Sequence, residues 1–230
     1  LIVAEIGVNW NGDFSVAKEM IHESNKAGVD LVKFQSFNEK LIKNHPEKKR
    51  LIKTSISKEN IEEINKIAKS EKIEWFCTPM FEDAVELLNS YVTKFKIRNF
   101  DGIQLLNNIK TPLFEKILNT DKEIIISTEM NPENCSFYSN ELINWLYVVP
   151  KYPCNFSDLD FTELSKFNGY SNHCPHFLAP LMASILGASI IEVHVTLDKN
   201  ANFIDNPVSF DFNELKFLID LIEKSKQIKN

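Results

Sequence analysis

Two histidines, His173 and His194, each end a short segment that has the pattern of a β-strand. Between them, the stretch from Phe177 to Leu186 is apolar and is closed by Gly187, which predicts a buried helix. A strand, a crossover helix and a second strand form neighbouring parallel strands, so both imidazoles can lie at one edge of a sheet. Two imidazoles in such places can bind one divalent cation. The alternative, that each is an ordinary buried histidine, stays open.

Two lysines, Lys33 and Lys96, lie near the ends of two further apolar segments. A buried ammonium is unfavourable unless it meets an opposite charge, so a lysine there indicates an anionic ligand or a carboxylate. Hydroxyl groups lie at the ends of two more segments, at Thr78 and Ser127, and Ser171 lies two residues before His173. Ammonium and hydroxyl donors match the oxygens of phosphate, and these residues together predict a phosphate site.

Three acidic residues, Glu5, Asp101 and Asp205, also lie close to predicted strands. Their carboxylates could transfer protons or accept hydrogen bonds from the hydroxyls of a sugar. Each is equally suited to be a solvated turn residue or a helix cap, so residue type alone leaves both interpretations open.

The elements that must position these side chains alternate along the whole chain. The predicted strands cover residues 1–6, 30–35, 74–79, 94–97, 124–128, 145–149, 170–173 and 192–196. Segments with helical periodicity follow them, and we expect eight strand-plus-helix units without a linker. The pattern predicts an α/β fold, a TIM (β/α)8 barrel in one domain over residues 1–230. A doubly wound open sheet is the alternative, but polar residues at the ends of many strands favour the barrel.

Composition limits the classes of partner. A formal charge of -6 gives no general attraction to nucleic acid or to an anionic membrane, so we expect a small-molecule ligand. The four cysteines include no Cys-x-x-Cys pair, which suits a reducing compartment. We find no apolar run of about 18 residues and no signal peptide, and we expect a cytoplasmic protein.

Several motifs occur in an order and spacing that resemble the sialic acid synthase family, which includes N-acetylneuraminate synthase and its pseudaminic and legionaminic acid relatives. They are residues 4–9 (Ala-Glu-Ile-Gly-Val-Asn), 32–35 (Val-Lys-Phe-Gln), 95–97 (Phe-Lys-Ile), 127–128 (Ser-Thr), 152–153 (Tyr-Pro), 170–173 (Tyr-Ser-Asn-His) and 192–194 (Glu-Val-His). The resemblance covers essentially the whole chain. Each motif alone is unspecific, but together they are specific.

The resemblance implies a TIM barrel that condenses phosphoenolpyruvate with the open-chain aldehyde of an N-acetylated amino sugar similar to N-acetylmannosamine. The products are phosphate and a nine-carbon 2-keto acid. By position, His173 and His194 match ligands of manganese, magnesium or another divalent ion. The residues that match phosphoenolpyruvate contacts are Lys33, Thr78, Lys96, Ser127 and Ser171. Those that match residues facing the sugar are Gln35, Asp101, Tyr152 and Asp205, while Glu5 matches an acid at the base of the site.

From this match, the candidate catalytic residues are Glu5, Lys33, Lys96 and Asp101. The resemblance also implies a homodimer. Family members carry a C-terminal antifreeze-like domain that supplies an arginine to the sugar site of the partner. The chain ends at Asn230, so we expect that domain to be absent from it.

Several residues depart from the family pattern, among them Pro150 in place of an asparagine before Tyr-Pro, and they keep other functions open. Trp10 and Asn172 replace a histidine and an aspartate, Phe100 replaces a glycine, and Glu129 brings a negative charge after Ser127-Thr128. We expect Phe100 and Glu129 to weaken phosphoenolpyruvate binding. One alternative is a degenerate barrel that binds a sugar or a partner without catalysis. Another is a metal-dependent sugar isomerase or aldolase on the same fold.

Overall fold

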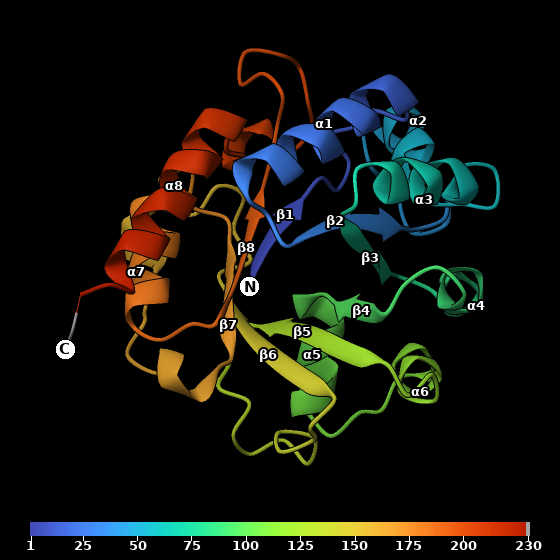
Figure 1. Ribbon diagram of the computed structural model, residues 1–230. Coiled ribbons are helices and arrows are strands. Elements are labelled where there is room, and N and C mark those ends of the chain that lie inside the picture. The colour runs from blue at the N-terminus through green and yellow to red at the C-terminus, as the bar shows by residue number, and fades with distance from the viewer. Residues whose placement is uncertain (229–230) are drawn as a thin grey trace.

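The computed structural model describes residues 1–228, which form one closed barrel of eight parallel strands. Each strand pairs with the next, and β1 closes the barrel by pairing with β8 (Figure 1). The strands are β1 (Ile2–Glu5), β2 (Leu31–Ser36), β3 (Glu74–Pro79), β4 (Lys94–Ile97), β5 (Glu123–Thr128), β6 (Ile143–Val148), β7 (Gly169–Asn172) and β8 (Ile190–His194). The predicted TIM barrel is confirmed, and the open sheet is excluded.

The helices lie outside the strands, as expected for this fold (Figure 1). The α-helices are α1 (Phe14–Ala27), α2 (Lys48–Leu51), α3 (Ile61–Ser70), α4 (Glu82–Asn89), α5 (Asn99–Leu106), α6 (Pro112–Leu118), α7 (Leu178–Ile185) and α8 (Phe212–Ser225). Short 3-10 helices cover residues 52–54, 156–158, 164–166 and 206–208.

The expected regular alternation of one strand and one helix is wrong in detail. The β2–β3 and β4–β5 connections each contain two α-helices, whereas the described β5–β6 and β6–β7 connections contain no α-helix. Residues 129–142 include three asparagines, a proline and two serines, which favour turns over helix. In the β6–β7 connection, Pro150 and Pro153 remove two backbone donors that a helix would need.

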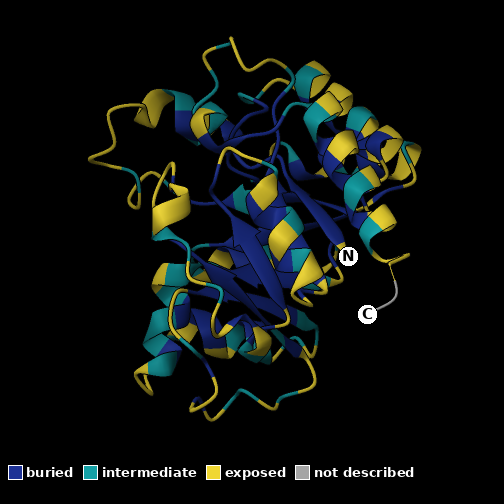
Figure 2. Cartoon of the chain, turned by 90° about the vertical axis from the view of Figure 1, so that its left-hand side faces the viewer, coloured by how far each residue is buried: buried dark blue, intermediate teal, exposed yellow. Residues whose placement is uncertain are grey.

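The core lies between the strands and the inner faces of the helices. Figure 2 shows the strands buried and the helices exposed only on their outer sides. Helix α1 illustrates the pattern, because Ala17, Met20 and Ile21 are buried one turn apart on one face. Gly28 ends this helix with φ of 93°, where its N–H donates to carbonyls of the last turn. The chain then enters β2 directly.

This architecture brings the C-terminal ends of all eight strands to one mouth of the barrel. Each strand delivers its last inward side chains there, and the connections that follow the strands surround them. None of the helices within residues 1–228 combines the length and the apolar character needed to cross a membrane.

Candidate active site

A cavity of about 730 Å³ opens at the mouth of the barrel. It collects eleven of the twelve residues that the sequence marks as candidates, which are Glu5, Lys33, Gln35, Thr78, Lys96, Ser127, Tyr152, Ser171, His173, His194 and Asp205. They come from seven of the eight strands, all except β6, and from three of the connections that follow strands. The exception, Asp101, does not line the cavity.

The floor of the cavity is a buried cluster of two lysines around one carboxylate, Glu192 of β8. The Nζ atom of Lys33 lies 2.8 Å from Oε2 of Glu192, and the Nζ atom of Lys96 lies 2.9 Å from Oε1 and 3.0 Å from Oε2. Ser171 donates a hydrogen bond of 2.8 Å to Oε1. All four residues are at most 4% exposed. The two positive charges therefore have a common buried counter-ion.

The two lysines respond differently to this cluster. Burial lowers the pKa of Lys96 to about 8, because Glu192 offsets only part of the desolvation and Lys33 repels its charge. Burial opposes charge on Lys33 as well, but Glu192 and Glu5 outweigh it and raise its pKa. Burial alone would raise the pKa of Glu192, yet the two ammonium groups hold it well below its usual range. Glu192 is therefore a carboxylate, and Lys33 is firmly cationic.

Glu5 of β1 is a second buried acid, and it is partnered on one oxygen. Gln35 donates a hydrogen bond of 2.6 Å to its Oε1 atom, while Oε2 accepts no hydrogen bond among residues 1–228 and lies 3.6 Å from Nζ of Lys33. Burial raises the pKa of Glu5 despite the nearby lysine. Gly7 makes room for this pair, since a Cβ atom there would lie 3.0 Å from Oε1 of Glu5. Glu5 can therefore hold or accept a proton at the cavity surface.

The two histidines face each other across 5.5 Å between ring centroids. His173 Nδ1–H donates a hydrogen bond of 2.7 Å to the carbonyl of Val149, which leaves Nε2 without a proton. Burial lowers the pKa of His173 to about 3, so its ring is neutral. Tyr152 packs on His173 at 4.0 Å between centroids, and its hydroxyl lies 3.4 Å from Nε2 of His194.

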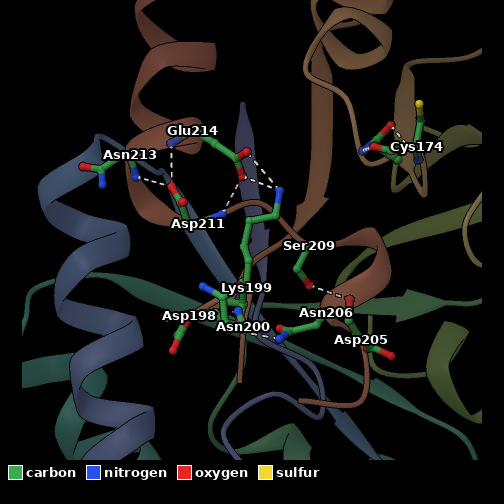
Figure 3. Close-up of polar contacts among 12 residues, drawn as sticks. Cys174, Asp198, Lys199, Asn200, Asp205, Asn206, Ser209, Asp211, Asn213 and Glu214 are labelled. Atoms are coloured by element: carbon green, nitrogen blue, oxygen red, sulfur yellow. Dashed lines mark hydrogen bonds and ion pairs between the residues drawn. The ribbon is translucent and has the colours of Figure 1, made fainter. Parts of the chain in front are cut away.

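Asp205 lies beside the second histidine, with Oδ2 3.3 Å from Nδ1 of His194. Burial opposes charge on His194, but the Asp205 carboxylate outweighs it and raises the pKa. Asn9 anchors the loop that carries Asp205, because its Oδ1 atom accepts 2.9 Å from the Asp205 amide and its amide donates 3.0 Å to Ser209. In Figure 3, Ser209 lies next to this turn and bonds the carbonyl of Asp205 at 2.7 Å.

The two ends of the same loop are attached to helix α8. Lys199 contacts the Glu214 carboxylate at 2.8 and 2.9 Å, and Glu214 forms a capping box with Asp211 (Figure 3). These contacts hold both ends of the segment that contains Asp205. The position of Asp205 at the cavity is therefore fixed by the fold and does not depend on its contact with His194.

The donor set fits a divalent cation that keeps open positions. Metal-binding histidines usually donate one ring N–H to a carbonyl or a carboxylate. The carbonyl of Val149 accepts from His173, and the Asp205 carboxylate lies 3.3 Å from Nδ1 of His194, which makes no hydrogen bond among residues 1–228. The ring nitrogens that remain are the Nε2 atoms of His173 and His194. Within residues 1–228 no group of three or more His, Cys, Asp or Glu side chains could hold a metal. Water or substrate would have to complete the coordination.

Asp101 is the candidate that the structure places elsewhere. Helix α5 begins at Asn99, directly after β4, and turns Asp101 toward Arg98, whose Nε atom donates 2.7 Å to Oδ2 of Asp101. Asp101 therefore contacts a residue that lines the cavity without lining it itself. The expectation that it faces a sugar stays a prediction.

Four of the residues that depart from the family pattern lie in different parts of the structure. Trp10 is buried in the core, where Nε1 donates 2.9 Å to the carbonyl of Thr54. Asn172 is buried and donates 2.7 Å to the carbonyl of Cys174. Phe100 is 66% exposed at the rim, and Glu129 is exposed and does not line the cavity. The expected effect of Glu129 and Phe100 on phosphate binding stays a prediction.

Among the cavity residues that were not candidates from the sequence, Glu192 and Arg98 carry a carboxylate and a guanidinium. Glu192 occurs in an apolar strand two positions before His194. Side chains two residues apart on a strand point to the same face, so this spacing could have identified Glu192 as a site residue. Arg98 follows Lys96 by the same period. Both lie on the cavity side of their strands, and both line the cavity.

Comparisons with known proteins show which chains this one is similar to. An uncharacterized protein of Methanocaldococcus jannaschii is 33% identical over 97% of this chain and 71% of its own length. The N,N'-diacetyllegionaminic acid synthase of Campylobacter jejuni is 32% identical over 97% of this chain and 75% of its own. The crystal structure of an N-acetylneuraminic acid synthetase from Leptospira borgpetersenii superposes with a TM-score of 0.86 and is 25% identical in sequence. The superposition covers 98% of this chain and 83% of the synthetase chain.

The match to a family model is nearly as long as the chain. The model of the NeuB family matches residues 20–230, from the middle of α1 to the last residue. Together with the relatives above, this match shows that the chain belongs to the NeuB family.

Proposed function

We propose that this chain condenses phosphoenolpyruvate with the open-chain aldehyde of an N-acetylated amino sugar and releases phosphate. The observation that carries the proposal is the cavity itself, which joins two buried lysines to a pair of imidazoles. The names of the relatives, synthases of legionaminic and N-acetylneuraminic acid, support the same reaction class. Four points stay predictions: the identity of the metal, the exact sugar, the homodimer and the cytoplasmic location.

The anionic substrate would occupy the side of the cavity formed by β3, β4 and β5. Lys96 supplies a buried charge there, while Thr78 and Ser127 supply hydroxyls that are 3% exposed. The Oγ atom of Ser127 has no hydrogen-bond partner among residues 1–228. A buried donor without a partner is unfavourable, so a ligand oxygen at this place would stabilise the site.

The sugar aldehyde would occupy the side formed by β7, β8 and β1. Gln35, Tyr152 and Asp205 line it with groups that can exchange hydrogen bonds with hydroxyls. His173 and His194 would hold a divalent ion, which when bound supplies Lewis-acid polarisation of a carbonyl. The neutral ring of His173 and the carboxylate next to His194 suit that role.

The reaction balances with water as the third reactant. The enol carbon C3 forms a bond to the aldehyde carbon, and the aldehyde oxygen takes a proton and becomes a hydroxyl. Water adds at C2 and loses a proton, for which Glu5 offers an unpaired buried oxygen. The bond from C2 to the bridging oxygen then breaks, phosphate leaves with that oxygen and takes up the proton of the C2 hydroxyl, and C2 becomes the ketone. The charges of Lys33 and Lys96 stabilise the anionic groups throughout.

The test is product analysis with phosphoenolpyruvate that carries an isotopic label in its bridging oxygen. The chain is incubated with manganese and a panel of N-acetylated amino sugars. We expect sugar-dependent release of labelled phosphate and a product whose mass equals sugar plus pyruvate. Phosphate release without a new carbon–carbon bond, or aldose–ketose conversion without phosphoenolpyruvate, would contradict the proposal and favour the other reaction classes.

A further inference from the structure

We infer that Arg98 is a specificity-determining residue that binds the phosphate group of phosphoenolpyruvate and that Asp101 positions it. This inference rests on the proposed function, because it concerns the anionic substrate of the same cavity. It assigns to Asp101 a role through Arg98 and not through the sugar.

The backbone places Arg98 directly above Lys96. The residue has φ of -76° and ψ of 164°, so the extended conformation of β4 continues through it. Side chains two residues apart on an extended strand point to the same face. Lys96 and Arg98 both line the cavity accordingly. The wall thus carries a buried cation at its base and a second cation, 37% exposed, nearer the mouth.

The guanidinium of Arg98 is held on one edge and open on the other. Its Nε atom donates 2.7 Å to Asp101, and its centre lies 5.2 Å from the ring centroid of Phe100. A terminal nitrogen, NH1, faces the sulfur of Met80 at 3.5 Å, and sulfur is a weak acceptor. Within residues 1–228 no oxygen accepts a hydrogen bond from the terminal nitrogens. That edge has the fork geometry that phosphate oxygens match.

The neighbours of Arg98 lack acceptors in the same way. Ser127, at the end of β5, has a buried hydroxyl without a partner among the described residues. Helix α5 is pressed against this strand end, because a Cβ atom at Gly102 would lie 2.6 Å from the carbonyl of Ser127. The helix that begins just after Arg98 therefore has a fixed position over β5. A phosphate between Lys96, Ser127 and Arg98 would satisfy donors that now have few acceptors.

An ordinary alternative is that Arg98 and Asp101 form only an i,i+3 surface pair at the start of a helix. A second alternative is that Arg98 recognises an anionic group on the sugar. The contact between Asp101 and Nε of Arg98 does not decide between these alternatives, because it is compatible with each of them.

The experiment is calorimetric titration of the whole chain with phosphoenolpyruvate, with inorganic phosphate, and with pyruvate, which lacks the phosphate group. We expect Arg98→Gln to weaken binding of the first two ligands by about ten- to a hundredfold and to leave pyruvate binding unchanged. Arg98→Lys keeps the charge but not the fork and should lose less. Asp101→Asn should lose least, because it leaves the guanidinium in place but less firmly held.

The matched control is Arg50→Gln, which removes a similar charge from a residue that does not line the cavity and bonds Asn11. Steady-state kinetics should show a higher KM for phosphoenolpyruvate in Arg98→Gln and an unchanged KM for the sugar. Phosphate and phosphoenolpyruvate affinities equal to those of Arg50→Gln would overturn the inference, as would a loss confined to the sugar. Phosphate binding that depends on Arg98, in a chain that forms no condensation product, would defeat the proposed function and leave this contact standing.

Discussion

The two walls of the cavity are built from different kinds of side chain. The wall formed by β7, β8 and β1 carries rings and acids that have a partner on one atom, such as His173 on the Val149 carbonyl and Glu5 on Gln35. Two buried atoms of this wall, Oε2 of Glu5 and Nδ1 of His194, make no hydrogen bond among residues 1–228. The wall formed by β3, β4 and β5 carries donors that lack acceptors, such as Ser127. A prearranged wall suits a polar neutral substrate and a cation, whereas a wall rich in donors suits an anion.

Glu192 connects the two walls. It comes from β8, yet it binds Lys96 of β4 and Lys33 of β2 across the interior of the barrel. Because it neutralises one of two buried positive charges, the floor can remain stable without a bound anion and still attract one. The difference between the walls therefore depends on this single carboxylate.

The largest expected effect comes from Glu192→Gln, which leaves two buried lysines without their common carboxylate. The free energy of unfolding should fall by about 3–5 kcal/mol, the usual cost of an uncompensated buried charge. Urea denaturation of the variant and of the native chain measures it. Glu223→Gln, which removes an exposed partner of Lys226, serves as control. A loss no larger than that of the control would mean that Glu192 does not hold the floor together.

Removal of either imidazole should disable the cation site and leave the other wall intact. We expect His173→Ala and His194→Ala to weaken manganese binding by more than about a hundredfold, because loss of an outer partner alone costs about ten- to a hundredfold. His176→Ala, at an exposed ring three residues from His173, is the matched control. Metal analysis of the dialysed proteins gives the answer. Manganese retained by both cavity variants at the level of the control would rule out the site.

Lys96→Met tests the other wall. The variant should bind phosphoenolpyruvate about ten- to a hundredfold more weakly, because a charge-assisted contact to an anion is lost. Manganese affinity should stay within about threefold, a change of less than 1 kcal/mol. Titration of each ligand measures both values. Equal losses for manganese and phosphoenolpyruvate would show that the two walls do not act separately.

The smallest expected effect is a pH dependence of phosphoenolpyruvate affinity that arises from Lys96. Its pKa is about 8 in the folded chain, and only its ammonium form attracts an anion. Affinity for phosphoenolpyruvate should therefore be level below pH 8 and fall by up to about tenfold per unit above it. Calorimetry across this range should show the fall in the native chain and its absence in Lys96→Met.

The free energy of unfolding should change with pH in the opposite direction to the affinity for phosphoenolpyruvate. The folded pKa of Lys96 lies below the ordinary value of 10.5, so the unfolded chain binds this proton more tightly. The contribution of Lys96 to the free energy of unfolding therefore rises with pH between about 8 and 10.5. Lys33, Glu192 and Glu5 share its surroundings, and Lys96→Met isolates its share by difference.

The barrel was predictable from sequence because strand and helix periods alternate and polar residues recur at strand ends. The site was predictable as a set for the same reason, since strand ends meet at one mouth. The network of the floor was not predictable, because the Glu192 contacts join strands 2, 4 and 8 across the interior, and spacing along the chain does not encode such contacts. Asp101 lies apart from the other candidates because α5 starts so soon after β4 that one turn of helix directs it to Arg98.

A crystal structure of the chain with phosphoenolpyruvate bound tests the difference between the walls most directly. The account predicts that the phosphate group lies within hydrogen-bond distance of Lys96, Ser127 and Arg98, with Asp101 still on Nε of Arg98. The reactive C3 atom should face the wall that carries His173 and His194. A phosphate bound at the histidines, with Ser127 and Arg98 left without an acceptor, would contradict the account.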